Sequence, residues 1–178
     1  MVNDTWTIRW REQLSETYLY GSEIEFHENG TVSFSNRLMP PGAVIHRWYS
    51  KTNYQRQRVE PSLPLIDGES AYSLTANIRL HDESGEMMIL RIIFYDRNDV
   101  QVDSVIIRDG KAFFKPSVRT YSYCVELING GNANFTFQSL VLEEVSREAF
   151  DEEQKRIEKI KEASYKSKKK RRKSKKHE

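Results

Sequence analysis

The sequence has little of what covalent chemistry requires. It contains one cysteine, Cys124, so the chain cannot form an internal disulfide bond. Its four histidines stand at positions 27, 46, 81 and 177, without the spacing typical of metal ligands. The chain has no G-x-S-x-G elbow, no glycine-rich phosphate loop and no H-E-x-x-H motif. The sequence therefore predicts a protein that is not an enzyme and that needs no cofactor or metal.

Long hydrophobic runs are missing as well. No apolar stretch approaches the ~20 residues of a membrane-spanning helix, and the polar start MVNDTWTIRW differs from a signal peptide. Cys124 lies in an alternating apolar run, which predicts a packed thiol rather than a nucleophile. A single cysteine also fits a reducing compartment. We expect a soluble, cytoplasmic protein, with a peripheral position at the inner face of the membrane as a further option.

The net charge of +2 conceals two regions of opposite sign. Residues 151–178 contain thirteen Lys/Arg and six Asp/Glu, whereas residues 1–150 contain fifteen and twenty. The end of the chain is a basic tail that can attract an anionic membrane surface at about 1 kcal/mol per cation. Because aromatic residues hardly interleave with these cations, we expect no sequence-specific binding of nucleic acid. A solubilising appendage is the alternative. The candidate anion-binding residues are Lys168, Lys169, Lys170, Arg171, Arg172 and Lys173.

Alternating polar and apolar residues predict a chain rich in β-strands up to residue 145. Strands are expected at 5–10, 22–26, 31–35, 44–48, 72–80, 87–95, 100–107, 117–128 and 134–145. The Asn29-Gly30 step favours a tight hairpin between two of them. Short strands with regular turn signals favour an all-β fold, an antiparallel β-sandwich of the jelly-roll type, with a distorted barrel as the second choice.

The pattern changes after the last expected strand. Acidic and basic residues in 147–165 stand four apart, which supports a charged helix. Beyond it, the low-complexity run YKSKKKRRKSKKHE predicts disorder through self-repulsion. We therefore expect three parts: a β-sandwich domain at 1–146, a charged helix at 147–165, and a disordered basic tail at 166–178.

Residues 37–66, RLMPPGAVIHRWYSKTNYQRQRVEPSLPLI, are the most informative segment of the chain. They combine aromatic, amide and guanidinium groups with proline and glycine, and they contain no Cys or Asp. Such groups hold sugars, peptides or proteins without reacting with them. In a sugar site, Trp48, Tyr49 and Tyr54 would stack on the ligand while Asn53, Gln55 and Arg56 bind its hydroxyl groups. The alternative is a buried strand, VIHRW, with Trp48 directed inward and flanked by two structured loops.

The order of LYGSEIEF, FSNRLMPPGAVIHRWYSKTNY and PSLPLI resembles the third accessory secretory proteins of the accessory Sec system of Gram-positive bacteria. The resemblance covers residues 6–145, and the basic tail lies outside it. It implies a jelly-roll fold similar to carbohydrate-binding modules. It also implies a non-catalytic role beside the first and second accessory secretory proteins. Their complex assists export of glycosylated serine-rich adhesins through the SecA2 and SecY2 machinery, so SecA2 and the adhesin are further candidate partners.

The composition of this segment and the resemblance together define the candidate partner- or glycan-binding residues. They are Arg37, Met39, Pro40, Pro41, Gly42, His46, Trp48, Tyr49, Lys51, Asn53 and Tyr54. Pro40-Pro41-Gly42 is expected to form a rigid turn, because proline restricts φ and glycine permits positive values. Two hypotheses follow. The segment binds partner proteins as part of a scaffold subunit, or it binds N-acetylglucosamine-bearing adhesin as a lectin-like module.

Overall fold

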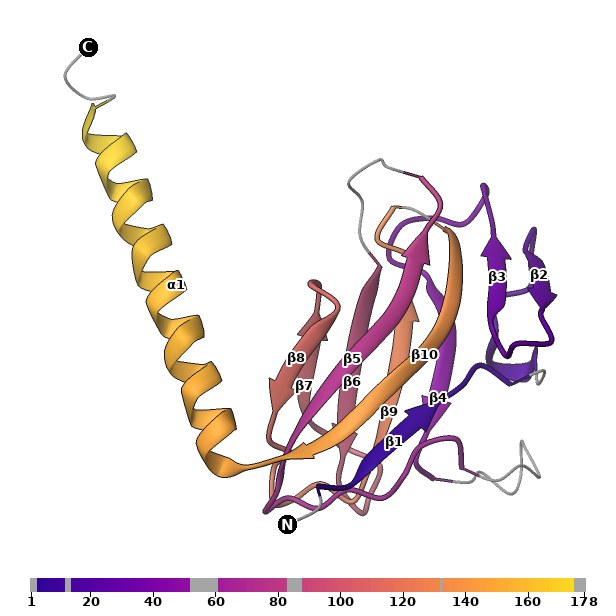
Figure 1. Ribbon diagram of the computed structural model, residues 1–178, viewed down its shortest axis with the longest axis horizontal. Coiled ribbons are helices and arrows are strands. Elements are labelled where there is room, and N and C mark those ends of the chain that lie inside the picture. The colour runs from indigo at the N-terminus through magenta and orange to yellow at the C-terminus, as the bar shows by residue number, and fades with distance from the viewer. Residues whose placement is uncertain (1–2, 12–13, 52–60, 83–87, 132, 175–178) are drawn as a thin grey trace.

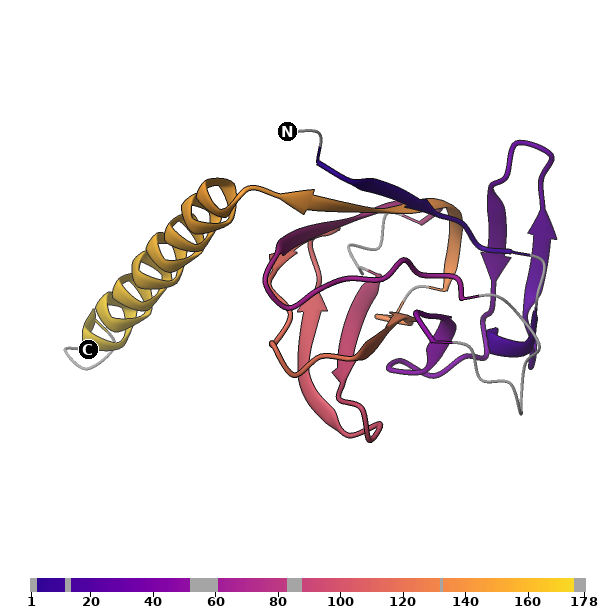
Figure 2. The same cartoon turned by 90° about the horizontal axis from the view of Figure 1, so that it is seen from below.

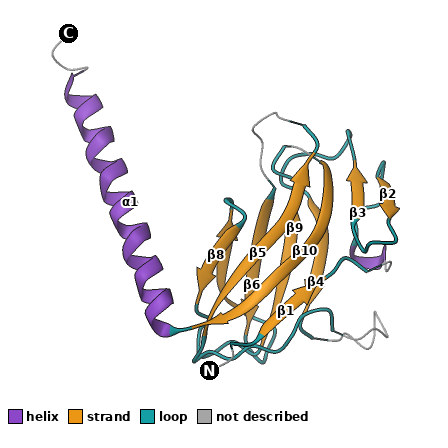
Figure 3. Ribbon diagram, in the orientation of Figure 1, coloured by secondary structure: helices purple, strands orange, loops and turns teal. Residues whose placement is uncertain are grey.

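Two antiparallel β-sheets pack face to face in this protein, and one long helix extends away from them (Figure 1). The computed structural model describes residues 3–11, 14–51, 61–82, 88–131 and 133–174. These ranges contain ten strands, a short 3-10 helix η1 (Leu14–Glu16) and helix α1 (Arg147–Ser174). Figure 3 shows the strands in orange and the helices in purple. The predicted all-β sandwich is confirmed.

The larger sheet has six strands arranged around its longest member, β10. In order across the sheet they are β2 (Glu23–Phe26), β3 (Val32–Ser35), β10 (Asn134–Val145), β5 (Ala71–Leu80) and β8 (Lys111–Phe114), with β1 (Thr5–Ile8) beside β10. On one side, β10 pairs with β5. On the other side, the start of β10 pairs with β3 and its end pairs with β1. One long strand near the end of the sandwich sequence thus pairs with three strands from the first eighty residues.

The smaller sheet has four strands in the order β4 (Val44–Tyr49), β9 (Ser122–Ile128), β6 (Ile89–Tyr95) and β7 (Gln101–Ile107). Every residue of β9 is buried, and most of β6 is buried as well. The dense apolar run of β6 thus forms a central strand. Strands β6 and β7 form a hairpin, with Asp99 at a φ of 58° in its turn.

Aromatic side chains fill the space between the two sheets. Trp10 lies 4.7 Å from His46 and 6.2 Å from Phe135, measured between ring centroids. Trp48 stacks on Phe137 at 5.4 Å and is only 1% exposed. Burying one large apolar side chain contributes about 1.5–3 kcal/mol. The alternation of β4 therefore places Trp48 inward, and of the two interpretations of VIHRW the buried strand is correct.

The structure corrects two strand predictions. Strand β8 was not expected, because its four residues KAFF are too short to show an alternation. They follow the turn at Gly110, whose φ is 76°. Strand β9 begins at Ser122 rather than at residue 117, because residues 118–119 form a turn in which the Thr120 amide donates to the Ser117 carbonyl.

Helix α1 runs through Ser174, so the disorder expected from residue 166 onward is wrong for 166–174. Lysine and arginine are good helix formers, no glycine or proline interrupts them, and cations suit the end of a helix dipole. Ser146 caps the start by accepting the Ala149 amide at 3.1 Å.

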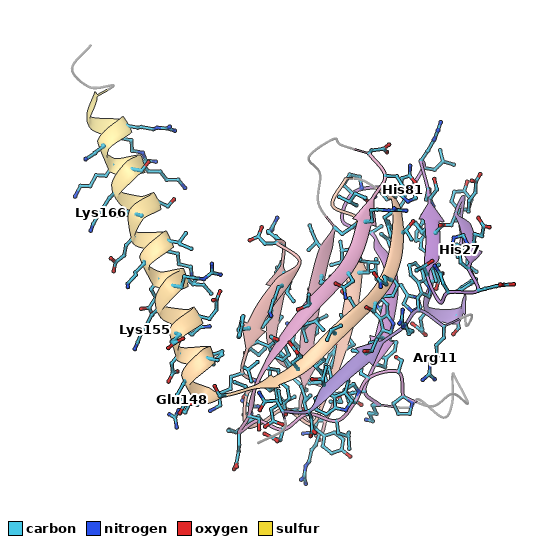
Figure 4. The ribbon with its side chains drawn as sticks, in the orientation of Figure 1. Arg11, His27, His81, Glu148, Lys155 and Lys166 are labelled. Atoms are coloured by element: carbon cyan, nitrogen blue, oxygen red, sulfur yellow. The ribbon has the colours of Figure 1, made fainter. Side chains whose placement is uncertain are left out.

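Only the first turns of α1 contact the body of the protein. The helix meets β5 and β8, and Phe150 and Ile157 are half-buried there. From residue 158 to 172 every side chain is exposed. Figure 2 shows the helix leaving the sheets, and Figure 4 shows Lys155 and Lys166 pointing into solvent. In the described part of the chain, no helix is both long and apolar enough to span a membrane.

Candidate partner-binding site

The loop at residues 36–42 forms most of the connection between β3 and β4, and it lies against the turn at residues 18–22. Both segments belong to the stretches that carry the family resemblance. The turn is attached to β4, because the Tyr18 amide donates to the Ile45 carbonyl at 2.8 Å. The loop is attached to the larger sheet, because the Asn36 amide donates to the Ala133 carbonyl at 2.9 Å. The two segments therefore form one surface at one end of the sandwich.

Asn36 is buried, and its side chain connects the loop to the turn. Its Nδ2 donates to the Tyr20 carbonyl at 2.8 Å and to Ser22 Oγ at 2.9 Å. Its Oδ1 accepts the backbone amides of Leu38 and Met39, each at 2.9 Å. The amide group thus makes all four hydrogen bonds that it can make. Loss of this side chain would leave buried backbone groups without partners.

Asn129, also buried, holds the other end of the loop. Its Nδ2 donates to the carbonyls of Met39 at 3.1 Å and Pro40 at 3.3 Å. Its backbone carbonyl accepts the Gly42 amide at 2.7 Å, and its own amide donates to the Ala43 carbonyl at 2.9 Å. Asn129 lies about ninety residues further along the chain, so the loop conformation depends on the folded sandwich.

Residues 40–43 form a tight turn. The Ala43 amide donates to the Pro40 carbonyl at 3.2 Å, and Gly42 has a φ of 85°. A type II turn requires a positive φ at its third position, which glycine supplies here, and proline is common at its second position. This agrees with the rigid turn predicted from Pro40-Pro41-Gly42.

Large apolar side chains on these segments point into solvent. Tyr20 is 76% exposed and Leu38 is 72% exposed, with Leu19 exposed beside them. The Leu38 side chain lies against Gly21, where an added Cβ would stand 3.3 Å from Leu38 Cδ1 and where φ is 71°. We call this surface the partner patch. It consists of Leu19, Tyr20, Arg37, Leu38, Pro40 and Pro41, all of which are exposed.

Three of the predicted binding residues do not lie on the surface. Met39, His46 and Trp48 are buried in the core, so the expectation that they contact a partner or a glycan is wrong. Trp48 Nε1 donates to the Arg9 carbonyl at 3.1 Å. His46 Nδ1 lies 2.7 Å from Thr17 Oγ1, and burial lowers the pKa of His46 to about 3. These side chains position β4 and its neighbours, and His46 is neutral.

Two further predicted residues lie toward the opposite end of β4 from the loop. Tyr49 is half-buried, and its hydroxyl donates to Glu16 at 3.1 Å. Lys51 is exposed, with Nζ 3.1 Å from Asp99 Oδ1 and 5.8 Å from the centre of the Tyr121 ring. Asn53 and Tyr54, together with Gln55 and Arg56, lie outside the described residues. Among the residues that the structure describes, the predicted binding residues are therefore divided between the loop and the opposite end of β4.

The surface histidines form ordinary polar contacts. His27 Nε2 lies 2.8 Å from Ser33 Oγ, and His27 Nδ1 lies 3.9 Å from the exposed Glu25 carboxylate. His81 contacts Asn134 and Thr136 on β10. Figure 4 shows His27 and His81 on different parts of the larger sheet. Among the residues that the structure describes, no three His, Cys, Asp or Glu side chains gather as a metal site. Cys124 is buried, as predicted.

Sequence reasoning missed the asparagines that hold the loop. Asn36 follows a strand and Asn129 precedes Gly130-Gly131, and both positions are typical of turns. What distinguishes Asn36 and Asn129 from ordinary turn residues is that they are buried, and burial cannot be predicted from a local sequence pattern. Tyr20 and Leu38 lie in segments whose sequence resembles the family. Their exposure to solvent in the structure distinguishes them from the other residues of those segments.

A family model described as Accessory Sec secretory system ASP3 matches residues 17–144. An accessory Sec system protein of that name from Streptococcus gordonii is 40% identical over 133 residues, which cover 75% of this chain and 82% of that protein. Another from Staphylococcus aureus is 28% identical over 148 residues, which cover 83% of this chain and 46% of that protein. The chain thus spans about half the length of the second relative.

Two solved structures have similar folds. A chain of the glycosylation associate protein (Gap123) complex from Streptococcus agalactiae has a TM-score of 0.72 and 33% identity, covering 80% of this chain and 45% of its own. A chain from the structure of accessory secretory protein 1, 2 and 3 in Streptococcus pneumoniae has a TM-score of 0.73 and 25% identity, covering 82% and 100%. The matched residues include both the partner patch and the asparagines that hold it. This chain belongs to the accessory Sec secretory system ASP3 family.

Proposed function

We propose that this chain is a non-catalytic subunit of an accessory Sec complex, with the first and second accessory secretory proteins as its partners. One observation carries the proposal: 82% of this chain matches an entire chain of a structure of accessory secretory protein 1, 2 and 3. The match to a chain of the Gap123 complex adds support. Both relatives were therefore studied within assemblies.

The partner patch is the surface that we assign to this assembly. Exposed Tyr20 and Leu38 beside Arg37 supply the kinds of side chain that dominate protein interfaces. The loop is held by the Asn36 and Asn129 hydrogen bonds, so it loses little conformational freedom when a partner binds. A stable interface needs ~800 Å² from each partner, so neighbouring surface must join the patch.

The wider role follows from the family. We propose that the complex assists glycan modification and export of glycosylated serine-rich adhesins, that it works with SecA2, and that it acts in the cytoplasm. The exposed cations of α1 between Lys166 and Arg172 offer a place for a peripheral contact with an anionic membrane surface.

A direct contact with the glycosylated adhesin is the second candidate function. Within the segment that first suggested it, burial of Trp48 removes the largest aromatic ring from the surface. A sugar site centred on that residue is therefore disfavoured, and the assembly role comes first.

Co-purification tests the assembly role. The variant Tyr20→Ala/Leu38→Ala changes exposed side chains, so it should stay folded but should fail to co-purify with the first and second accessory secretory proteins. Tyr121→Ala is a matched control, because Tyr121 is also exposed but lies outside the patch. Retention of both partners by the double variant would contradict the assignment of this surface.

A further inference from the structure

Strand β5 of the larger sheet is covered on one side for only part of its length. Strand β8 pairs with residues 72–75, and the Ala76 amide continues this ladder by donating to the Gly110 carbonyl at 2.7 Å. At Gly110 the chain arrives from β7, which belongs to the other sheet. In the described part of the chain, residues 77–80 therefore pair only with β10. Figure 1 shows β8 stopping short of the far end of β5.

The uncovered end of β5 presents backbone hydrogen-bonding groups. Successive residues of a strand direct their N–H and C=O groups to opposite sides. The Ala76 amide points toward β8, whereas the His81 amide donates to the Asn134 carbonyl in β10 at 3.0 Å. Ile78 and Leu80 share the direction of Ala76, so their N–H and C=O groups point away from β10. These are the groups to which an added strand forms hydrogen bonds.

An apolar cleft lies beside this free edge, and we call it the edge cleft. The alternation of β5 directs the side chains of Ala76, Ile78 and Leu80 toward the core, and all three are half-buried. They line the cleft together with Leu90 and Ile107 of the smaller sheet, and its volume is about 180 Å³. An apolar cavity of about 150 Å³ holds a molecule the size of benzene. The edge cleft therefore has room for one aliphatic or aromatic side chain.

One charged residue, Arg108, lines the edge cleft. It is exposed and forms no ion pair with any residue that the structure describes, including its neighbour Asp109. A carboxylate on the occupant would complement this charge, because guanidinium and carboxylate groups pair through two hydrogen bonds. A second copy of this chain fits less well. Residues 77–80 are too short to supply the ~800 Å² that each copy contributes to a stable dimer.

We propose that the edge cleft binds an extended peptide segment of a partner protein, which adds an antiparallel strand to the larger sheet beside Ile78 and Leu80. One apolar side chain of the segment enters the cleft, and an acidic residue on the same face of the segment pairs with Arg108. The inference goes beyond the assembly role and does not depend on it. Strands β2 and β3, which lead to the partner patch, lie at the opposite edge of this sheet.

The test is an NMR titration of the ¹⁵N-labelled full chain with the capped peptide Thr-Val-Thr-Leu-Thr-Glu. Its valine, leucine and glutamate lie on one face of a strand. We expect amide shifts at residues 76–80, 88–90 and 107–110, with a Kd below about 1 mM. Methylation of the leucine nitrogen removes an N–H that the added strand donates to β5. The methylated peptide should therefore bind at least about tenfold more weakly.

Two variants test the two features of the edge cleft. Ala76→Leu fills the cleft and leaves the backbone edge in place, so it should weaken peptide binding at least about tenfold. Arg108→Glu changes an exposed side chain, so it should stay folded and should prefer the peptide Thr-Val-Thr-Leu-Thr-Lys. It decides the matter if Ala76→Leu does not fold. Arg97→Glu is the matched control, because Arg97 is exposed and does not line the cleft. It should bind as the unmodified chain does.

Several outcomes would overturn the proposal. They are the absence of amide shifts up to ~5 mM peptide, shifts confined to another surface, equal binding of the methylated peptide, and an unchanged peptide preference in Arg108→Glu. A further one is the appearance of the same shifts, without peptide, when the concentration of the chain rises and sedimentation shows a dimer. A second copy of the chain would then occupy the edge cleft.

Discussion

The loop at residues 36–42 and helix α1 are both exposed, yet they are held in different ways. The loop is held by hydrogen bonds from Asn36 and Asn129, each of which connects segments distant in sequence. Residues 158–172 of the helix are exposed, so this part is held by its own backbone hydrogen bonds, whereas an earlier turn also has a local ion pair between Arg156 and Glu153. Unfolding of the sandwich would therefore destroy the loop conformation, whereas changes in the outer helix would leave the sandwich intact.

This difference separates two kinds of surface. The partner patch presents apolar side chains in a fixed arrangement, which suits recognition of another protein surface. Residues 158–172 present exposed charges along a helix, which suits a contact set by charge rather than by shape. The predictions below test whether the loop and the helix really differ in this way.

The largest effect should come from Asn36→Ala. The variant leaves the buried backbone amide of Met39 and the partly buried backbone groups of Tyr20 and Leu38 without these partners. We expect a loss of about 3 kcal/mol in the free energy of unfolding. Urea denaturation measures it. Asn77→Ala is the control, because Asn77 is exposed and makes one side-chain hydrogen bond, to Ser139. Equal losses in the two variants would show that Asn36 does not hold the loop in the way we describe.

A smaller loss of stability is expected when the pH is lowered. His46 has a pKa of about 3 in the folded chain and an ordinary value near 6.5, because burial disfavours its charged form. Between these values the unfolded chain binds a proton that the folded chain does not. The His46 contribution to stability is therefore complete above pH 6.5 and is lost as pH falls toward 3. The loss should be about 2 kcal/mol between pH 6.5 and 5.

His46→Gln isolates this contribution from that of the carboxylates. Over the same pH interval, the free energy of unfolding of the variant should fall by about 2 kcal/mol less than that of the unmodified chain. Urea denaturation at each pH measures this difference. Parallel losses in the two proteins would mean that His46 is protonated in the folded state. The core beneath β4 would then be more open than the structure indicates.

The smallest effect on stability should come from removing the outer helix. Deletion of residues 158–178 removes no packed side chain of the described body, so the free energy of unfolding should change by less than about 0.5 kcal/mol. The same deletion should abolish binding to vesicles that contain anionic phospholipid, and added salt should weaken the binding of the full chain. Neutral vesicles provide the control. Unchanged vesicle binding after the deletion would remove the membrane role from α1.

Strand positions could be predicted from the sequence where a strand is long enough to show a clear alternation of polar and apolar residues. The range 134–145 was predicted with its observed bounds, because a long alternation follows a clear turn. The four residues of β8 are too few to contain such an alternation. The charge of residues 166–174 predicted disorder through repulsion, but these residues form a helix because lysine and arginine have a high helix propensity. The partner patch was only partly predictable: Arg37, Pro40 and Pro41 were among the predicted binding residues, whereas Leu19, Tyr20 and Leu38 were not, because a local pattern does not show which of these apolar side chains are exposed. The asparagines that shape it act through hydrogen bonds across the fold.

Hydrogen–deuterium exchange of this chain, alone and bound to the first and second accessory secretory proteins, tests the central claim most directly. If the partner patch is the docking surface, residues 18–21 and 36–42 should exchange more slowly in the complex. Residues 158–172 should exchange as they do in the free chain. Slower exchange in the helix, with no change at the loop, would contradict the account and identify α1 as the surface that joins the complex.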